Sequence, residues 1–169
     1  AAFLVASSPR RKQSAGSGRQ GRVLENTETS RRDAVRGRLL AQMPKGAVAA
    51  EIGVWEGKFS RRILEECAPA RLHLIDPWEY MPAFANTGFG RRKNRDLMEV
   101  KYREVAAAFA GDPRVVIHRA TSAEALGAMP DASLDWVYVD GNHNEPFTGE
   151  DIALCLRKVR PDGSIAGDD

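Results

Sequence analysis

The chain alternates short apolar runs with helical stripes, and this alternation restricts its fold more than any other feature. Five apolar runs are typical of strands, and the segments between them carry apolar side chains three or four residues apart, as helices do. The expected strands are Ala47–Ile52, Arg71–Ile75, Val115–His118, Leu134–Val139 and Ser164–Ala166. Strands that are apolar on both faces and alternate with helices predict a doubly wound, Rossmann-like α/β fold with a parallel sheet.

The bulk composition fits one ordinary globular domain. Of 169 residues, 43% are hydrophobic and 28% are charged, and the net charge of +2 argues against a nucleic-acid partner. The two cysteines, Cys67 and Cys155, lie far apart, and we expect buried reduced thiols in a cytoplasmic protein. No apolar run approaches the roughly 20 residues that cross a bilayer, so we expect no membrane partner.

The first 24 residues differ from the rest of the chain. They hold five basic residues and many Ser and Gly, but no acidic residue. Such a segment buries too little apolar area to offset its ordering entropy, which predicts a disordered basic tail over 1–24 before a domain over 25–169. A nucleic-acid-binding arm and a transit-peptide remnant are alternatives, but a solvated tail without specific function is favoured.

Polar residues follow the expected strands, where doubly wound folds bind their ligands. A purely structural sheet has no reason to place carboxylates at these ends. Asp76 follows Gly53 by 23 residues, the spacing of the acid that accepts hydrogen bonds from a ribose diol after a glycine loop. The G-x-G-x-x-G pattern of a dinucleotide site is absent, which argues against a nicotinamide-dependent enzyme. The residues at or just after these strand ends are Glu51, Gly53, Asp76, Thr121, Ser122, Asp140, Asp168 and Asp169.

Four motifs over residues 47–169 together resemble a known family. The segments Glu51–Gly57 and Leu74–Trp78 resemble motifs I and II of class I S-adenosylmethionine-dependent methyltransferases. Tyr138–His143, followed by Asp151 and by Pro161–Asp169, resembles the signature of their Methyltransf_24-like subfamily. Asp162-Gly163 replaces the usual Gly-Gly pair, and Asp168-Asp169 stands where many members have His-Asp.

The resemblance implies how the chain would bind S-adenosylmethionine. Glu51 and Gly53, in the loop that ends at Gly57, would face the methionine moiety. Asp76 would hold the ribose hydroxyls, and Trp78 would pack on the adenine. Thr121 and Ser122 would contact the adenine edge, and Asp140 would lie beside the methyl group.

The expected reaction is methyl transfer to a small-molecule or glycan acceptor, at a hydroxyl oxygen. Asp140 and His143 are the candidate general bases, although a loop-capping histidine is the structural alternative for His143. Asp140 and Asp169 would instead hold Mg²⁺ or another divalent cation if the acceptor binds through a metal. The competing hypothesis is a non-catalytic nucleoside-binding or interaction domain.

The resemblance also implies a longer sheet. The family's sheet has seven strands, so the first five would be present and two more would follow Asp169. The outer edge of the fifth strand would then lack a neighbour and favour homo-oligomers or aggregation.

Overall fold

The described residues build an α/β domain. The computed structural model describes residues 2–6, 31–82, 89–141 and 147–168. A first helix covers residues 31–40. The strands are β1 (Ala2–Ala6), β2 (Val48–Ile52), β3 (Arg71–Asp76), β4 (Val115–Arg119), β5 (Leu134–Val139) and β6 (Val159–Asp168). The other helices are α2 (Lys58–Cys67), the short 3-10 helix η2 (Arg92–Asn94), α3 (Leu97–Phe109), α4 (Ser122–Gly127) and α5 (Phe147–Lys158).

Within the described residues these strands form a six-stranded sheet in the order β1-β6-β5-β2-β3-β4, and every neighbouring pair is parallel. From β2 the chain moves outward to β3 and β4, and then returns to β5 on the other side of β2. The strand order therefore reverses between β2 and β5, the place where such sheets bind ligands. The doubly wound fold predicted from the sequence is confirmed.

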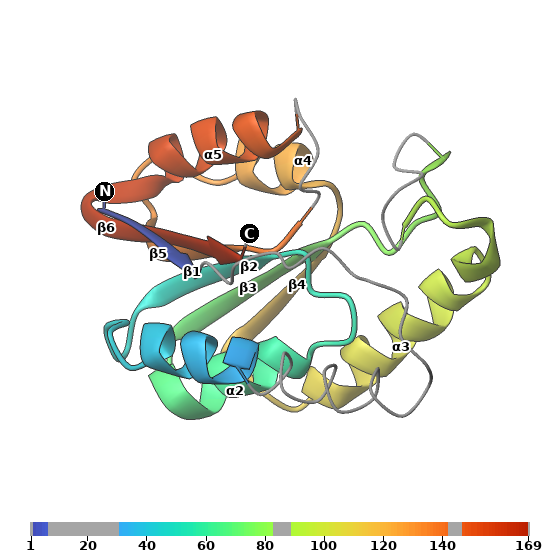
Figure 1. The fold of residues 1–169 in the computed structure, drawn as a ribbon, viewed down its shortest axis with the longest axis horizontal. Coiled ribbons are helices and arrows are strands. Elements are labelled where there is room, and N and C mark those ends of the chain that lie inside the picture. The colour runs from blue at the N-terminus through green and yellow to red at the C-terminus, as the bar shows by residue number, and fades with distance from the viewer. Residues whose placement is uncertain (1, 7–30, 83–88, 142–146, 169) are drawn as a thin grey trace, which may run out of the picture.

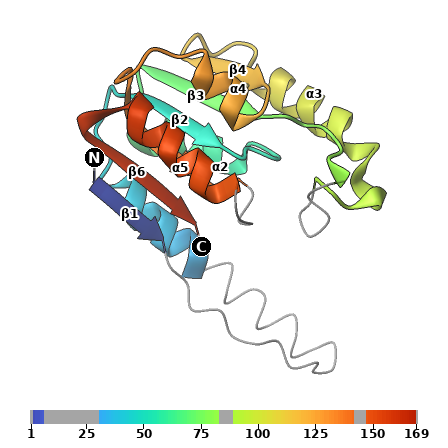
Figure 2. The ribbon, with the colours of Figure 1, turned by 90° about the horizontal axis from the view of Figure 1, so that it is seen from above.

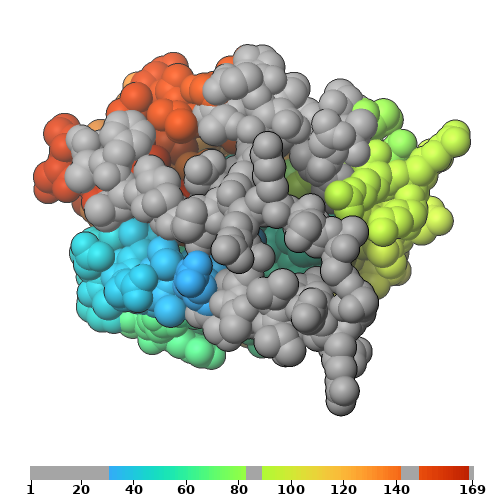
Figure 3. Space-filling view, in the orientation of Figure 1, coloured from blue at the N-terminus to red at the C-terminus, as the bar shows by residue number. Residues whose placement is uncertain are grey.

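Helices cover both faces of the sheet (Figures 1 and 2). Helix 31–40, α2 and α3 pack on one face, and α4 and α5 pack on the other. Successive side chains of a strand point to opposite faces. Ala49 of β2 therefore joins the first core, while Ala50 and Ile52 join the second. In the space-filling view, α5 and α3 lie toward opposite sides of the visible face (Figure 3). No helix of the described segments combines the length and the apolar character that a membrane crossing needs.

The structure corrects the prediction of disorder over all of residues 1–24. Ala2–Ala6 forms β1, which pairs in parallel with β6 in a register that places Ala2 opposite Ser164. The run Phe3-Leu4-Val5 is apolar and suits a strand, and pairing satisfies backbone groups along the outer edge of β6. The strand that the sequence predicts as the fifth, with an open outer edge, is β6, and β1 covers this edge along the paired stretch. Residues 7–24 lie outside the described part of the chain.

The last strand begins earlier than the sequence predicts. Arg160–Gly163, which precedes the predicted strand Ser164–Ala166, lies within β6, at an irregularity where the pairing jumps from Val159 opposite Leu134 to Ser164 opposite Trp136. A Cβ atom on Gly163 would lie 2.4 Å from the carbonyl oxygen of Asp135. Glycine at this position lets the irregular stretch lie directly against β5.

Candidate functional site

The ends of β2 and β5 meet at a glycine that has no room for a side chain. Gly53 has a φ of 87°, and a Cβ atom there would lie 2.2 Å from the carbonyl oxygen of Asp140. The amide of Gly53 donates to the carbonyl of Ile75, and the amide of Asp140 donates to that of Ile52, at 2.9 and 2.8 Å. These bonds join the residue after β2 to the end of β3, and the residue after β5 to the end of β2, at the reversal point of the sheet.

Glu51 is a buried acid on the face covered by helix 31–40 and α2. Its side chain is 2% exposed, and the hydroxyl of Ser60 in α2 donates to its Oε2 atom across 2.5 Å. Burial raises the pKa of Glu51 to about 8; the Ser60 hydrogen bond opposes this rise, and the charge of Asp140 adds to it. At neutral pH the protonated form of Glu51 is therefore favoured.

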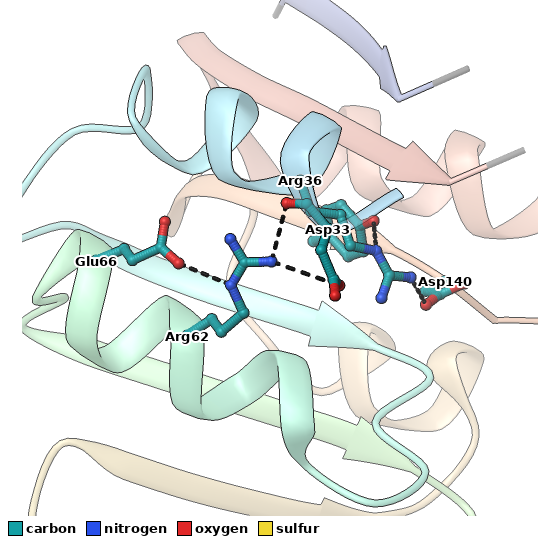
Figure 4. Close-up of polar contacts among 6 residues, drawn as sticks. Asp33, Arg36, Arg62, Glu66 and Asp140 are labelled. Carbon is teal, nitrogen blue, oxygen red and sulfur yellow. Dashed lines mark hydrogen bonds and ion pairs between the residues drawn. The ribbon is translucent and has the colours of Figure 1, made fainter. Parts of the chain in front are cut away.

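Arg36 joins the site from helix 31–40 (Figure 4). Its Nη2 atom lies 2.6 Å from Oδ2 of Asp140, and its Nε atom donates to the hydroxyl of Tyr138 across 3.1 Å. The guanidinium also lies over the ring of Phe59, 4.9 Å from its centroid. The side chain of Arg36 is only 16% exposed, so this ion pair is held in a largely dry setting.

Sequence reasoning missed Arg36, although a signal was present. Leu39, Leu40 and Met43 follow it three, four and seven residues later, so the arginine lies within the apolar stripe of its helix. A charged residue on a buried face needs a partner. The helix that carries it is fixed by Arg62 of α2, whose Nη1 atom donates to the carbonyl of Asp33 across 3.2 Å (Figure 4).

Asp76 ties two loops together at the end of β3. It is completely buried, and its carboxylate accepts from the amides of Trp55 and Trp78 at 2.9 and 2.8 Å. Burial raises its pKa to about 6, against the lowering effect of these hydrogen bonds. Both tryptophans have positive φ angles, 56° and 42°, so the carboxylate holds strained backbone in place. In this geometry its contacts are with the protein backbone, and the predicted ribose contact stays a prediction.

Trp78 lies in the core, not on a ligand surface. Its ring is completely buried beside Tyr102, 5.5 Å away between centroids, and its indole nitrogen donates to the carbonyl of Trp55. This position differs from the predicted stacking on adenine because Asp76 turns the chain at Trp78 inward, onto the face covered by α2 and α3. Gly57, with a φ of 68°, is the N-cap residue of α2.

A cavity of about 520 Å³ opens on the other face, between the strand ends and α5. Its size lies within the ~300–1,000 Å³ usual for small-molecule sites. Apolar groups of Ile52, Ile75, Pro77 and Leu154 form much of its wall, together with Gly53 and Gly141 at the reversal point. Thr121 and Ser122, which the sequence places at the adenine edge, also line it.

The polar wall of the cavity is built at the start of α4. Thr121 caps this helix in a reciprocal arrangement with Glu124, in which each residue accepts from the other's amide. The hydroxyl of Ser122 donates to Oδ1 of Asp151 in α5, and Asp151 also lines the cavity. Burial raises the pKa of Asp151, and the Ser122 hydrogen bond lowers it.

Two residues of the predicted base and metal sets, His143 and Asp169, lie outside the described part of the chain. Among the residues that are described, no three His, Cys, Asp or Glu side chains gather as a metal site would require. Asp140, the third of these candidates, is paired with Arg36.

Comparisons with solved structures support the fold. A putative type II methyltransferase from Anaeromyxobacter dehalogenans is 20% identical with a TM-score of 0.50, covering 77% of this chain and 44% of that one. Spermidine synthase from Thermotoga maritima is 18% identical with a TM-score of 0.51, covering 78% and 40%. A protein from Corynebacterium glutamicum is 14% identical with a TM-score of 0.54, covering 86% and 65%. The chain thus spans less than half of the first two proteins.

Sequence comparison gives the family. No curated protein sequence matches the chain. A sequence model of the family described as "Methyltransferase domain" matches residues 50–169, which is well over half of the chain. The protein therefore belongs to this family of S-adenosylmethionine-dependent methyltransferases.

Proposed function

We propose that the chain binds S-adenosylmethionine over the reversal point of the sheet and transfers its methyl group to a hydroxyl of a small-molecule or glycan acceptor. One observation carries the proposal: an acidic cluster, made of Glu51, Asp76 and Asp140, and a largely apolar cavity meet at Gly53, on opposite sides of the sheet end. S-adenosylmethionine has the matching division, with a charged methionine end and a flat nucleoside end.

The acidic cluster suits the methionine end. Glu51 lies close enough to Asp76 and Asp140 for their charges to raise its pKa, and Arg36 is the basic group that opposes them. S-adenosylmethionine carries an ammonium and a sulfonium, and these positive charges would favour the ionised form of the carboxylates. It also carries a carboxylate, which the guanidinium of Arg36 can bind. Glu51 would receive the ammonium, and Asp76 would position the Trp55 and Trp78 loops around the nucleoside.

The sulfonium makes the methyl group reactive, so the protein has to align and activate the acceptor. Asp140 follows β5 at the reversal point, and Arg36 fixes the direction of its carboxylate. We favour Asp140 as the group that orients the acceptor hydroxyl and takes its proton. We prefer this role to the binding of a divalent cation because Arg36 already places a positive charge beside the carboxylate of Asp140. We also propose a cytoplasmic setting, which the two buried free thiols support.

Calorimetry with S-adenosylhomocysteine tests the binding site. The full chain should bind S-adenosylhomocysteine and not NAD. Glu51→Gln, which keeps the shape and an acceptor for Ser60, should weaken binding at least about tenfold, since hydrogen bonds to charged groups contribute about 1.5–3 kcal/mol. The control is Glu65→Gln, an exposed position on α2.

Methyl transfer is tested separately, with methyl-labelled S-adenosylmethionine and a panel of hydroxylated acceptors. Turnover that persists in a chelator would support Asp140 over the cation. Failure to bind S-adenosylhomocysteine would contradict the cofactor proposal. Binding without turnover on any acceptor would favour the non-catalytic nucleoside-binding hypothesis.

A further inference from the structure

Two carboxylates line the cavity without a part in the proposed reaction: that of Glu150, which is exposed, and that of Asp151, which is buried. Asp151 lies in the first half of α5 and is only 7% exposed, yet it lines the cavity together with Ser122 of α4. No lysine or arginine is among the described residues that line this cavity. A carboxylate in such a largely apolar wall costs free energy unless a hydrogen-bond donor meets it.

The two oxygens of Asp151 have different surroundings. The hydroxyl of Ser122 donates to Oδ1 and thereby fixes the orientation of the carboxylate. Oδ2 lies on the side of Gly141, 3.6 Å from where a Cβ atom on that glycine would be. Oδ2 accepts no hydrogen bond from the described residues. It is not fully enclosed either, because Nε1 of Trp136 is the atom that is both enclosed and without a hydrogen bond among the described residues. Oδ2 is therefore an acceptor that a molecule in the cavity can reach.

The surroundings of Oδ2 define the chemistry of its partner. Ile75, Pro77 and Leu154 give the cavity apolar walls suited to the faces of a flat heterocycle. At the edge of that heterocycle, a carboxylate oxygen accepts from an amino group and repels a carbonyl oxygen. Because Ser122 engages the other oxygen, a single donor fits better than the paired N–H groups of guanine.

We infer that Asp151, oriented by Ser122, selects the 6-amino group of adenine and rejects a purine with oxygen at that position. The inference rests on the proposed function, since it assumes that the nucleoside end of S-adenosylmethionine occupies the cavity. It adds a specificity residue from α5 to the cofactor site, with Ser122 as its positioning residue.

The test compares two ligands by calorimetry on the full chain. S-adenosylhomocysteine carries the 6-amino group, and S-inosylhomocysteine carries oxygen in its place. The wild-type chain should prefer S-adenosylhomocysteine by at least about tenfold, as expected for a hydrogen bond to a charged acceptor. Asp151→Asn should remove or invert this preference, because its amide can donate to the oxygen.

Two further variants keep the test informative. Ser122→Ala should reduce the preference without abolishing binding, because it releases the carboxylate while leaving its charge. Asp162→Asn makes the same chemical change at an exposed position in β6 and should leave the preference unchanged. Thermal melting of each variant checks that it folds. If Asp151→Asn does not fold, the ratio of the two affinities in the wild-type chain and in Ser122→Ala decides whether Asp151 selects the 6-amino group.

The outcomes separate the two ideas. If the wild-type chain binds both ligands equally well, the selection by Asp151 is wrong while the proposed cofactor site stands. The same holds if both variants keep the wild-type ratio. If S-adenosylhomocysteine does not bind at all, the proposed function fails, and this inference fails with it.

Discussion

Arg36 and Asp140 are 104 residues apart in the chain, yet a 2.6 Å ion pair joins them beside the point where the sheet reverses. The arginine comes from a helix that precedes all the recognised motifs, and the aspartate comes from the motif after β5. Helix 31–40 therefore contributes to the candidate site, beyond covering the sheet.

Removing the guanidinium should destabilise the fold and misdirect Asp140. Arg36→Gln removes the positive charge of the ion pair from beside the half-buried carboxylate of Asp140, at an expected cost of about 1–3 kcal/mol in the free energy of unfolding. Urea denaturation measures this cost. Arg38→Gln, on the exposed side of the same helix, should have almost no effect. Equal stability of the two variants would show that the ion pair contributes little.

The pH dependence of stability should report the buried acid. The pKa of Glu51 is raised to about 8, above its ordinary 4.5 in the unfolded chain, so the folded state retains a proton that the unfolded state releases. Its contribution to stability is therefore fully present below about pH 4.5 and is lost as the pH rises toward 8. Glu51→Gln should remove this loss, so the variant should gain stability relative to wild type between pH 5 and 8. Urea denaturation across this range checks it, and parallel curves would contradict the assignment.

Ligand binding should show the opposite trend with pH. If the ammonium of the ligand meets Glu51, the ionised form binds better, and the affinity for S-adenosylhomocysteine should rise as the pH approaches 8. Calorimetry in buffers of different ionisation enthalpy should detect a proton released on binding at pH 7. Glu51→Gln should release no such proton, and an unchanged release would assign it to another group.

A methyl group at Gly53 should disrupt the site. Gly53→Ala places a Cβ atom 2.2 Å from the carbonyl oxygen of Asp140 and strains a positive φ angle, so the loop after β2 must move. We expect a loss of several kcal/mol, within the range for overpacking and backbone strain together, and no cofactor binding. In the matched control, Gly127→Ala, the new Cβ atom meets no atom within 4 Å. Thermal melting and calorimetry compare the two, and a stable, binding-competent Gly53→Ala would refute the close approach.

The first strand should protect the edge of β6. Deletion of residues 1–6 removes β1 and exposes backbone donors and acceptors of β6 that otherwise pair with it. The shortened chain should melt at a lower temperature and self-associate more strongly in light scattering. Deletion of residues 8–20 leaves β1 intact and serves as the comparison. Identical behaviour of the two deletions would show that β1 contributes nothing.

Local sequence determined the periodic elements and their order. Apolar runs and helical stripes correctly predicted five strands of the parallel sheet, because the hydrophobic pattern depends on which face of each element is buried. The motifs placed Glu51, Gly53, Asp140 and the pair Thr121-Ser122 near the strand ends, and the connectivity of the fold brings those ends together.

Only the tertiary structure decided the contacts between distant segments. Arg36 reaches Asp140, Ser122 reaches Asp151, and Asp76 turns inward to the amides of Trp55 and Trp78. The short strand at Ala2–Ala6 also depends on pairing, since an isolated five-residue strand has nothing to satisfy its backbone until β6 lies beside it. A residue's own pattern indicates which face it occupies, but its hydrogen-bond partners depend on how the layers pack. In this chain packing decided that Asp76 holds two loops and that Asp151 lines the cavity.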